Sequence, residues 1–205
     1  MNFKAIGFDY GGVIGGVGST GVAFNVQVCD LLGIDEGTYR NIYFNLNHMI
    51  NLGEVTTWRE FWLIFLDKLG QPEKLDALMN ISDEAVKNLQ AIDPNMPVLI
   101  DELRRKGYKT GLLSNATLEG GANMRVQGLD KHFNVFHISA ETKLMKPDPK
   151  AFEHLTKSLG VELNELVFID DAEKSLSTAK ECGFTPILFK GFDQLRERLI
   201  ELGVL

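Results

Sequence analysis

Residues Lys4–Ile14 read KAIGFDYGGVI, and this stretch decides the fold. Its apolar run, Ala5–Phe8, predicts a short strand that is buried on both faces. The strand ends at Asp9, and Gly11 and Gly12 then allow the backbone to turn sharply and bring amide N–H groups close to an anion. Open α/β sheets bind ligands at the carboxyl ends of their strands, which is where Asp9 stands. Turn formation alone also explains an Asp before glycines, so the assignment depends on the rest of the chain.

Composition describes an ordinary globular protein of 205 residues, 44% hydrophobic and 24% charged. The formal net charge of -7 argues against a nucleic-acid partner, which would need a basic face, but it does not exclude an anionic substrate. Cys29 and Cys182 are the only cysteines, and two isolated thiols suit a reducing compartment. No apolar run has membrane-spanning length and no signal-peptide pattern is present, so we expect a cytoplasmic protein without a membrane partner. The sequence does not indicate an oligomeric state.

The carboxyl-terminal half alternates helices with apolar strands, which predicts parallel βαβ units. Strands are expected at 110–114, 135–138, 166–169 and 186–189. Helices are expected at 96–106, 118–127, from 149 onward, through 179 to about 183, and at 193–202. The fold class is therefore α/β, with a Rossmann-like parallel sheet.

Between the first strand and the second, from about Val22 to Ile92, the apolar residues recur at helical spacing with little strand signal. One apolar stripe contains Tyr39, Ile42, Tyr43, Leu46 and Met49 or Ile50, and another contains Phe61, Trp62, Phe65, Leu66 and Leu69. Thr57 and Glu60 form a capping-box pattern before the second stripe. Two further helices are expected, at 73–79 and 83–89. We therefore divide the chain into an α/β core of residues 1–14 and 94–205 and an inserted helical-bundle cap of residues 15–93.

Two features of the insert leave alternatives open. Gly16, Gly18 and Gly21 spell the dinucleotide fingerprint G-x-G-x-x-G, but they do not directly follow a strand, and no second strand ends in an acid at the required distance. We interpret Gly15–Gly21 as a hinge, with a second hinge near Asp93, and keep nicotinamide binding as the rival. On one helix face, the polar residues Asn41, Asn45 and His48 recur at i, i+4 and i+7. This row either contacts a polar ligand or forms an uncharged part of the surface.

The polar residues at the strand ends converge at one edge of the expected sheet. They are Asp9, the pair Ser114-Asn115 and the pair Asp170-Asp171, with Lys146 on a loop after another strand. Three crowded carboxylates repel one another unless one is protonated or all share a cation. A cluster of carboxylates completed by a backbone carbonyl and water suits Mg²⁺.

With Mg²⁺ and Lys146 present, a phosphate dianion can enter this edge. Ser114 would donate a hydroxyl hydrogen bond to a phosphate oxygen, and the amides around Tyr10 and Gly11 would add backbone donors. A carboxylate that faces phosphorus is a nucleophile, so Asp9 would form an aspartyl-phosphate that water later hydrolyses.

The four motifs, in this order, resemble those of the haloacid dehalogenase-like (HAD) hydrolases, in the subfamily with a helical cap. The matching segments are FDYGGV with Asp9, LLSNA with Ser114, KPDP with Lys146 and VFIDD with Asp170 and Asp171. The resemblance covers residues 1–14 and 94–205. It implies that Asp9 is the nucleophile, that Ser114, Asn115 and Lys146 bind phosphate, and that Lys146 also orients Asp9. It also implies that Mg²⁺ is held by Asp9, Asp171, the carbonyl of Gly11 and, assisting them, Asp170.

Two positions depart from the usual motifs of phosphatases in this family. Gly11 stands where most carry a second Asp, and Ser175 stands where an Asn often follows the acidic pair. Sugar-1-phosphatase-like members of the family look similar at D-x-G-[NG]-V. We therefore expect a Mg²⁺-dependent phosphomonoester hydrolase acting on a small phosphorylated metabolite, such as a sugar phosphate. The alternatives are a catalytically impaired binding or regulatory protein on the same scaffold and, with less support, a haloacid dehalogenase.

Overall fold

The protein is described here by a computed structural model that covers residues 2–15, 20–87 and 92–205. Its core is a five-stranded sheet with the strand order β3-β2-β1-β4-β5. Every neighbouring pair of strands is parallel, as the alternation of helices and strands predicts. The strands are β1 (Ala5–Phe8), β2 (Lys109–Ser114), β3 (Val135–Ile138), β4 (Leu166–Asp170) and β5 (Thr185–Leu188). The expected Rossmann-like α/β fold is therefore confirmed.

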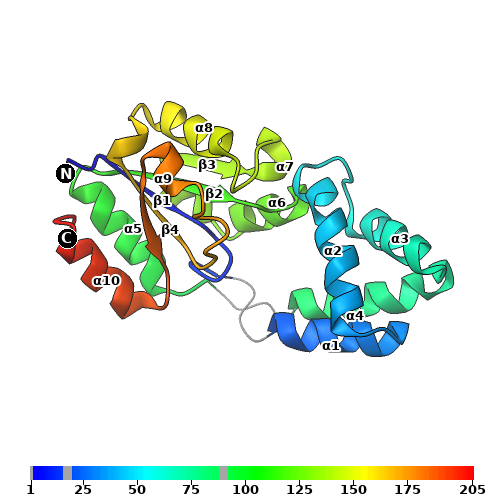
Figure 1. The fold of residues 1–205 in the computed structure, drawn as a ribbon. Coiled ribbons are helices and arrows are strands. Elements are labelled where there is room, and N and C mark those ends of the chain that lie inside the picture. Colours follow the sequence, from blue (N-terminus) through cyan, green and yellow to red (C-terminus); the bar gives the residue numbers. More distant parts are fainter. Residues whose placement is uncertain (1, 16–19, 88–91) are drawn as a thin grey trace.

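Helices cover both faces of the sheet (Figure 1). Residues of α5, α6 and α10 share one buried cluster with Ile6 and Phe8 of β1, whereas α8 and α9 pack on the opposite face against Phe168. The core helices are α5 (Asn95–Arg105), α6 (Leu118–Val126), α7 (Ser139–Thr142), α8 (Pro149–Leu159), α9 (Ala179–Cys182) and α10 (Phe192–Glu201). Short 3-10 turns lie at η2 (Leu129–His132) and η3 (Leu163–Glu165). Side chains from alternate strand positions therefore enter two separate hydrophobic layers, as the period of a strand requires.

Two strand glycines let α8 approach the sheet closely. Gly7 and Gly111 are paired neighbours on β1 and β2. A Cβ atom at Gly111 would lie 2.8 Å from a methyl carbon of Leu155, and one at Gly7 would lie 2.5 Å from the ring of Phe168. Since interiors are close-packed, a side chain at either position would push α8 or its neighbours away.

The inserted segment forms the helical lobe to the right of the core in Figure 1. It contains α1 (Thr20–Leu32), α2 (Glu36–Asn51), α3 (Trp58–Leu69), η1 (Pro72–Lys74) and α4 (Leu75–Lys87). Both predicted apolar stripes lie in one hydrophobic cluster that this lobe supplies by itself. Stacked and edge-to-face aromatic pairs, such as Trp58 with Trp62 at 6.0 Å, fill much of that cluster. The lobe therefore has a hydrophobic core of its own.

Three local expectations need correction. One helix, α4, replaces the two expected at 73–79 and 83–89, since only the single turn of η1 precedes it. The helix expected after Asp171 is reduced to the one turn of α9, preceded by hydrogen-bonded turns. In the capping box, the Thr57 hydroxyl accepts from the amide of Glu60, but the Glu60 carboxylate accepts from Thr56 rather than Thr57.

The two connections between the lobes meet at a backbone hydrogen bond, in which the amide of Asp93 donates to the carbonyl of Ile14 at 2.8 Å. The glycine segment expected to be a hinge lies largely outside the described residues, as do two of its fingerprint glycines, Gly16 and Gly18. The nicotinamide-binding alternative requires a second strand after the glycine segment, but the chain forms helix α2 there. The division into a core of residues 1–14 and 94–205 and a cap of residues 15–93 stays a prediction.

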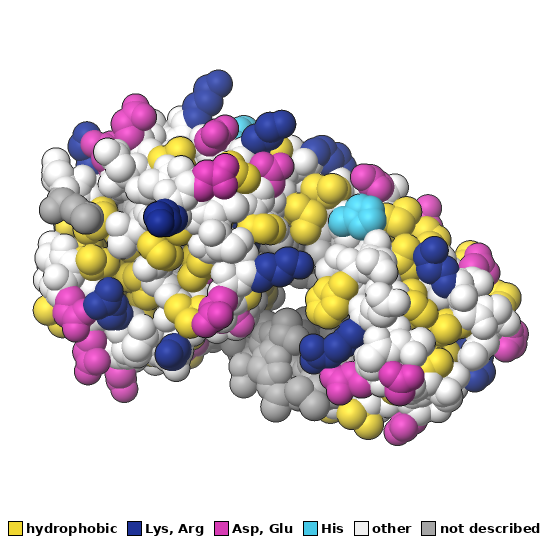
Figure 2. Space-filling view, viewed as in Figure 1, with side chains coloured by type: hydrophobic (Ala, Val, Ile, Leu, Met, Phe, Trp, Pro, Cys, Tyr) yellow, Lys and Arg dark blue, Asp and Glu magenta, His cyan; other side chains and the backbone are white. Residues whose placement is uncertain are grey.

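Figure 2 shows basic and acidic side chains interspersed over both lobes of the face in view. Within the described ranges, no helix combines the length and the apolar character needed to cross a membrane.

The helix cap at Thr57 offers a direct test of the helical lobe. Thr57→Ala removes the acceptor for the Glu60 amide and should lower the free energy of unfolding by about 1 kcal/mol. Trp58 and Trp62 are the only two tryptophans and both lie in α3, so denaturation followed by tryptophan fluorescence reports on this lobe.

Thr56→Ala is the matched control, because Thr56 is exposed and its side chain makes no hydrogen bond within the described chain. Its effect should stay within about 0.5 kcal/mol. Equal losses for the two variants would contradict the assigned cap.

Candidate active site

The ends of three adjacent strands bring the predicted residues to one edge of the sheet. Phe8, the last residue of β1, pairs with Leu112 of β2 and Ile169 of β4. The next residue, Asp9, donates its amide to the carbonyl of Ile169 at 2.9 Å. Asp170 therefore lies beside Asp9, and Ser114 ends β2 just beyond the paired positions, where it is buried.

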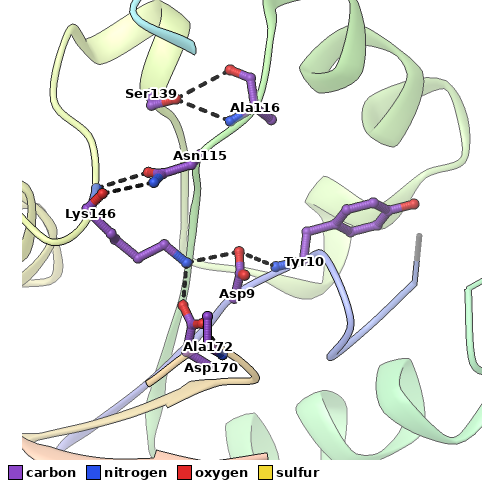
Figure 3. A network of polar contacts seen from close by, with 8 residues as sticks. All are labelled: Asp9, Tyr10, Asn115, Ala116, Ser139, Lys146, Asp170 and Ala172. Atoms are coloured by element: carbon purple, nitrogen blue, oxygen red, sulfur yellow. Dashed lines mark hydrogen bonds and ion pairs between the residues drawn. The ribbon is translucent and has the colours of Figure 1, made fainter. Parts of the chain in front are cut away.

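Lys146 joins the first and fourth motifs through its ammonium group. Its Nζ lies 2.9 Å from Oδ1 of Asp9 and 2.5 Å from Oδ2 of Asp170 (Figure 3). The Lys146 side chain is 1% exposed and the Asp170 side chain 0%, so both charges are withdrawn from water. The ammonium also lies 5.3 Å from the ring centroid of Phe168. One buried cation thus holds two carboxylates from different strands.

The Asp9 carboxylate has a fixed orientation. Its Oδ1 accepts from the amide of Tyr10 at 2.7 Å as well as from Lys146. Because two donors already reach Oδ1, Oδ2 is the oxygen left to attack an electrophile or to bind a cation. The Tyr10 side chain points away from the carboxylate, toward the segment that leads into the cap (Figure 3).

A third carboxylate completes an all-oxygen cluster. One oxygen each from Asp9, Asp170 and Asp171 lie within 4.8 Å of one another. The pKa of Asp9 is raised to about 6, chiefly by burial; Lys146 opposes the rise, and the charge of Asp170 adds to it. Burial and the neighbouring Asp170 also raise the pKa of Asp171. Carboxylates that resist ionisation together, in a set of hard oxygen donors, match the ligands that Mg²⁺ prefers.

The loop after β1 is shaped to the third carboxylate. Gly12 has φ +70°, and a Cβ atom there would lie 2.1 Å from Oδ2 of Asp171. Only glycine permits this approach. At Gly11, by contrast, a Cβ atom would meet nothing within 4 Å. Glycine therefore stands at these two adjacent positions for different reasons. The contact with Asp171 requires glycine at position 12, whereas no steric constraint requires it at position 11.

Asn115 fixes the loop that carries Lys146. Its Nδ2 donates to the Lys146 carbonyl, and its Oδ1 accepts from the Lys146 amide, both at 2.8 Å. Asp170 is held similarly, since its Oδ1 accepts from the amide of Ala172 at 2.9 Å. Asn115 thus supports Lys146 through its side chain, and its expected role in phosphate binding stays a prediction.

The family model for haloacid dehalogenase-like hydrolases matches residues 3–183. The chain belongs to this family. Among its HAD relatives of known sequence, a pig bifunctional epoxide hydrolase 2 is 28% identical over 127 residues, which make up 59% of this chain and 23% of the relative. A phosphoglycolate phosphatase of Rhodospirillum rubrum is 28% identical over 117 residues, 56% of this chain and 48% of the relative. The chain thus spans half or less of the length of these curated relatives.

Solved HAD structures share the whole fold. A HAD family enzyme from Bacteroides thetaiotaomicron superposes with a TM-score of 0.73 at 22% identity, covering 97% of this chain and 99% of that one. The same enzyme in complex with magnesium and inorganic phosphate gives a TM-score of 0.67 at 22% identity, over 94% and 98% of the two chains. At this identity the likeness shows the fold, including the helical lobe, and not the activity.

Two residues of the HAD core were missed by the sequence reasoning, although they connect the lobes. Ser139 donates to the carbonyl of Asn51 at 2.6 Å, and Lys143 donates to the carbonyl of Leu52 at 2.7 Å. Ser139 directly follows strand β3, so the same strand-end rule that singles out Ser114 could have found it. Lys143 carries no comparable signal, because its partners are backbone carbonyls some 90 positions away in the chain.

The polar row on α2 is exposed, as either interpretation of it requires. Asn41, Asn45 and His48 are all exposed, and Asn45 donates to Asn41 at 3.2 Å. Phe44 lies on the same helical face and is 59% exposed. Contact of this row with a ligand stays a prediction.

At the other departure from the usual HAD motifs, Ser175 lies in the turns after Asp171, where its amide donates to the carbonyl of Ala172.

Substitutions at Gly11 and Gly12 test whether Asp171 belongs to the expected cation site. Gly12→Ala adds a positive-φ penalty of about 1–2 kcal/mol and forces the Asp171 carboxylate to move. We expect a less stable protein that also loses most of the Mg²⁺-induced rise in melting temperature.

Gly11→Ala, one residue away, should keep both the stability and the response to Mg²⁺, because its Cβ meets open space. Thermal unfolding with and without Mg²⁺ measures both effects. An unchanged response to Mg²⁺ in Gly12→Ala would show that Asp171 is not part of the cation site.

Proposed function

We propose that this HAD hydrolase is a Mg²⁺-dependent phosphomonoesterase that forms an aspartyl-phosphate on Asp9 and acts on a small phosphorylated metabolite. The observation that carries the proposal is the buried Lys146 ammonium, which contacts both Asp9 and Asp170 beside a third carboxylate. This arrangement orients a nucleophile and provides the donor set for a divalent cation at the same point. The magnesium and phosphate bound by the Bacteroides HAD enzyme, and the name of the Rhodospirillum relative, point in the same direction.

The residues present fit a Mg²⁺ ion. Asp9, Asp171 and the Gly11 carbonyl would hold it, with Asp170 assisting, and the close approach of Gly12 to Asp171 keeps that carboxylate beside the loop. When bound, Mg²⁺ would neutralise phosphate charge and act as a Lewis acid on the phosphoryl group.

Asp9 and water share the chemical work in two displacements. An Oδ2 lone pair of Asp9 forms a bond to phosphorus, and the bond from phosphorus to the ester oxygen breaks with its electrons on that oxygen, which then takes a proton from solvent. Water attacks phosphorus and loses a proton to solvent, the bond from phosphorus to Asp9 breaks, and inorganic phosphate leaves with the Asp9 carboxylate restored. Lys146 keeps Oδ1 in place throughout, while Ser114 at the end of β2 would donate to a phosphate oxygen.

Gly11 sets a limit on the substrates. An acid at that position would protonate the departing oxygen and later take a proton from water, which is worth about 10²–10⁴-fold in rate. Glycine provides no such proton, and Lys146 acts on Asp9 and phosphate rather than on the leaving oxygen. We therefore infer a preference for esters whose leaving oxygen is weakly basic, of which glycosyl-1-phosphates are the metabolic example. This preference matches the resemblance to sugar-1-phosphatase-like proteins.

The rival functions explain less of the site. Haloacid dehalogenases of this family resemble one another in lacking the acidic pair, which this chain has at Asp170 and Asp171. A purely regulatory protein would leave unexplained why a lysine is buried against the nucleophile. The free thiols of Cys29 and Cys182 suit a reducing location, and we place the protein in the cytoplasm.

The nucleophile is tested by Asp9→Asn, which should lower turnover of an aryl phosphate by several orders of magnitude. The amide keeps a hydrogen-bond acceptor for Tyr10, so circular dichroism should show an intact fold. Excess EDTA should abolish wild-type turnover, and added Mg²⁺ should restore it.

Asp148→Asn is the matched control, since it removes one carboxylate and leaves the helix cap of α8 in place. Its turnover should equal that of the wild type. Full activity of the wild type in EDTA, or near-normal turnover of Asp9→Asn, would overturn the mechanism.

The leaving-group preference is tested by rates for phosphomonoesters of graded leaving-group pKa. Wild-type rates should fall steeply as the leaving oxygen becomes more basic. Gly11→Asp should flatten that slope, because the space around Gly11 admits a carboxyl group that can transfer a proton.

Gly11→Asn is the control, as it has the same size without an acid, and it should keep the steep slope. A flat wild-type series would mean that another group provides the proton and would remove this account of Gly11.

A further inference from the structure

We propose that Ser139 and Lys143 dock the carboxyl end of cap helix α2 onto α7 and, through Ser139, onto Ala116 in the loop after β2, so that the docked cap positions the phosphate site. The docking is read from the structure alone; its effect on catalysis rests on the proposed function. Ser139 and Lys143 act here as positioning residues, since neither contacts the three clustered carboxylates.

The carboxyl end of α2 is completed by side chains of the core. The last carbonyls of a helix have no partner within the helix and carry the negative end of its dipole. Lys143 donates at 2.7 Å to the carbonyl of Leu52, the residue that caps α2, and at 3.2 Å to that of Gly53, the residue after it. Ser139 donates at 2.6 Å to the carbonyl of Asn51, the last residue of α2. The end of α2 lies beside α7 in Figure 1.

Backbone conformation on both sides fits this contact. Gly53 has φ +65°, and a Cβ atom there would lie 2.8 Å from the Ala140 carbonyl oxygen and 2.6 Å from Nζ of Lys143. Lys143 itself has φ +60° and is the one non-glycine residue with positive φ in the part of the chain that the structure describes. Such a conformation is strained for a residue with a side chain and persists only where the surroundings hold it. The two hydrogen bonds to the cap are such a constraint.

Ser139 links the cap to the second motif. Its side chain is fully buried, and Oγ accepts from the amide of Ala116 at 3.0 Å. A hydroxyl has one proton to donate, and the shorter contact, to Asn51, takes it. A single oxygen atom thus holds the end of the cap on one side and the loop after β2 on the other.

The link continues to the reaction centre. Ala116 follows Asn115, whose amide holds both backbone polar atoms of Lys146. The Lys146 ammonium in turn holds Asp9 and Asp170. Figure 3 shows this series of contacts from Ser139 to Asp170. If α2 leaves α7, Ser139 loses its acceptor in the cap, and the loop that carries Ser114 and Asn115 loses a fixed neighbour.

Hydrogen–deuterium exchange on the free protein tests the docking with Gly53→Ala and Gly70→Ala. The two glycines have nearly the same φ, +65° and +66°, and both follow a cap helix, so the backbone penalty is matched. Only Gly53 faces the core; nothing lies within 4 Å of a Cβ at Gly70. Gly53→Ala should speed exchange of the peptide containing Ala116 by about tenfold, which is the effect expected from the loss of one hydrogen bond. Gly70→Ala should leave the exchange rate of that peptide unchanged.

A second pair of variants covers the case in which Gly53→Ala does not fold. Lys143→Met keeps the apolar stem of an exposed side chain but removes both hydrogen bonds to the cap, and Lys150→Met on α8 is its control. Lys143→Met should speed exchange at Ala116 and raise KM for an aryl phosphate about fivefold or more. Equal exchange in Lys143→Met and Lys150→Met would overturn the proposal.

The exchange result stands apart from the proposed function, since it needs no substrate. Faster exchange at Ala116 without turnover of any phosphate ester would keep the docking and reject the phosphatase. Phosphatase activity with exchange at Ala116 unchanged in Gly53→Ala and Lys143→Met would keep the function and reject the docking.

Discussion

The buried ion pairs of Lys146 are the interaction on which the site depends. Removing an ammonium and two carboxylates from water is costly, and their attraction offsets that cost only with good geometry. Here one cation faces three clustered carboxylates, so negative charge remains in excess. Burial is the main cause that raises the pKa of Asp9 to about 6; the charge of Lys146 opposes this rise, and the charge of Asp170 adds to it. In the metal-free protein, ionising Asp9 therefore costs folding free energy, and that cost appears as pH rises from about 4 to about 6. A site that bears such a cost is organised for function rather than for stability.

The packing of the core determines where Lys146 emerges. Helix α8 begins at Pro149, three residues after Lys146, and Asp148 caps it by accepting from the amide of Lys150. Because Gly7 and Gly111 let α8 lie close to the sheet, the loop before α8 is held near the strand ends. Asn115 then joins that loop to the end of β2. These two buried glycines thus contribute to the distance between Lys146 and Asp9.

The strands and the strand-end residues could be predicted from the sequence because their signals are local. Apolar runs that break on Asp9, Ser114 and Asp170 mark both the strand and its functional end, and parallel topology then brings the three together. Short-range details were less accessible: the Glu60 carboxylate accepts from the amide of Thr56 rather than from that of Thr57. The strand-end rule marks Ser139, but its contact with the cap and that of Lys143 could not be predicted, because their partners are backbone carbonyls, which every residue type has. Their position depends on how a separate hydrophobic core, that of the cap, lies against the first.

Gly11 and Gly12 look equivalent in the sequence, but the structure gives a different reason for glycine at each position. The pair GG reads as one flexible turn, yet Gly12 is fixed by the Asp171 carboxylate and by its positive φ, while Gly11 faces open space. A carboxyl group at position 11 would meet no steric obstacle, so its absence is a chemical property of the site and not a consequence of the fold. In the proposed mechanism, Asp9 and Lys146 would act on the phosphoryl group, and no side chain at position 11 would act on the leaving oxygen. Selectivity among phosphate esters would then follow from the substrate's own leaving group, and the cap would need only to hold that substrate in place.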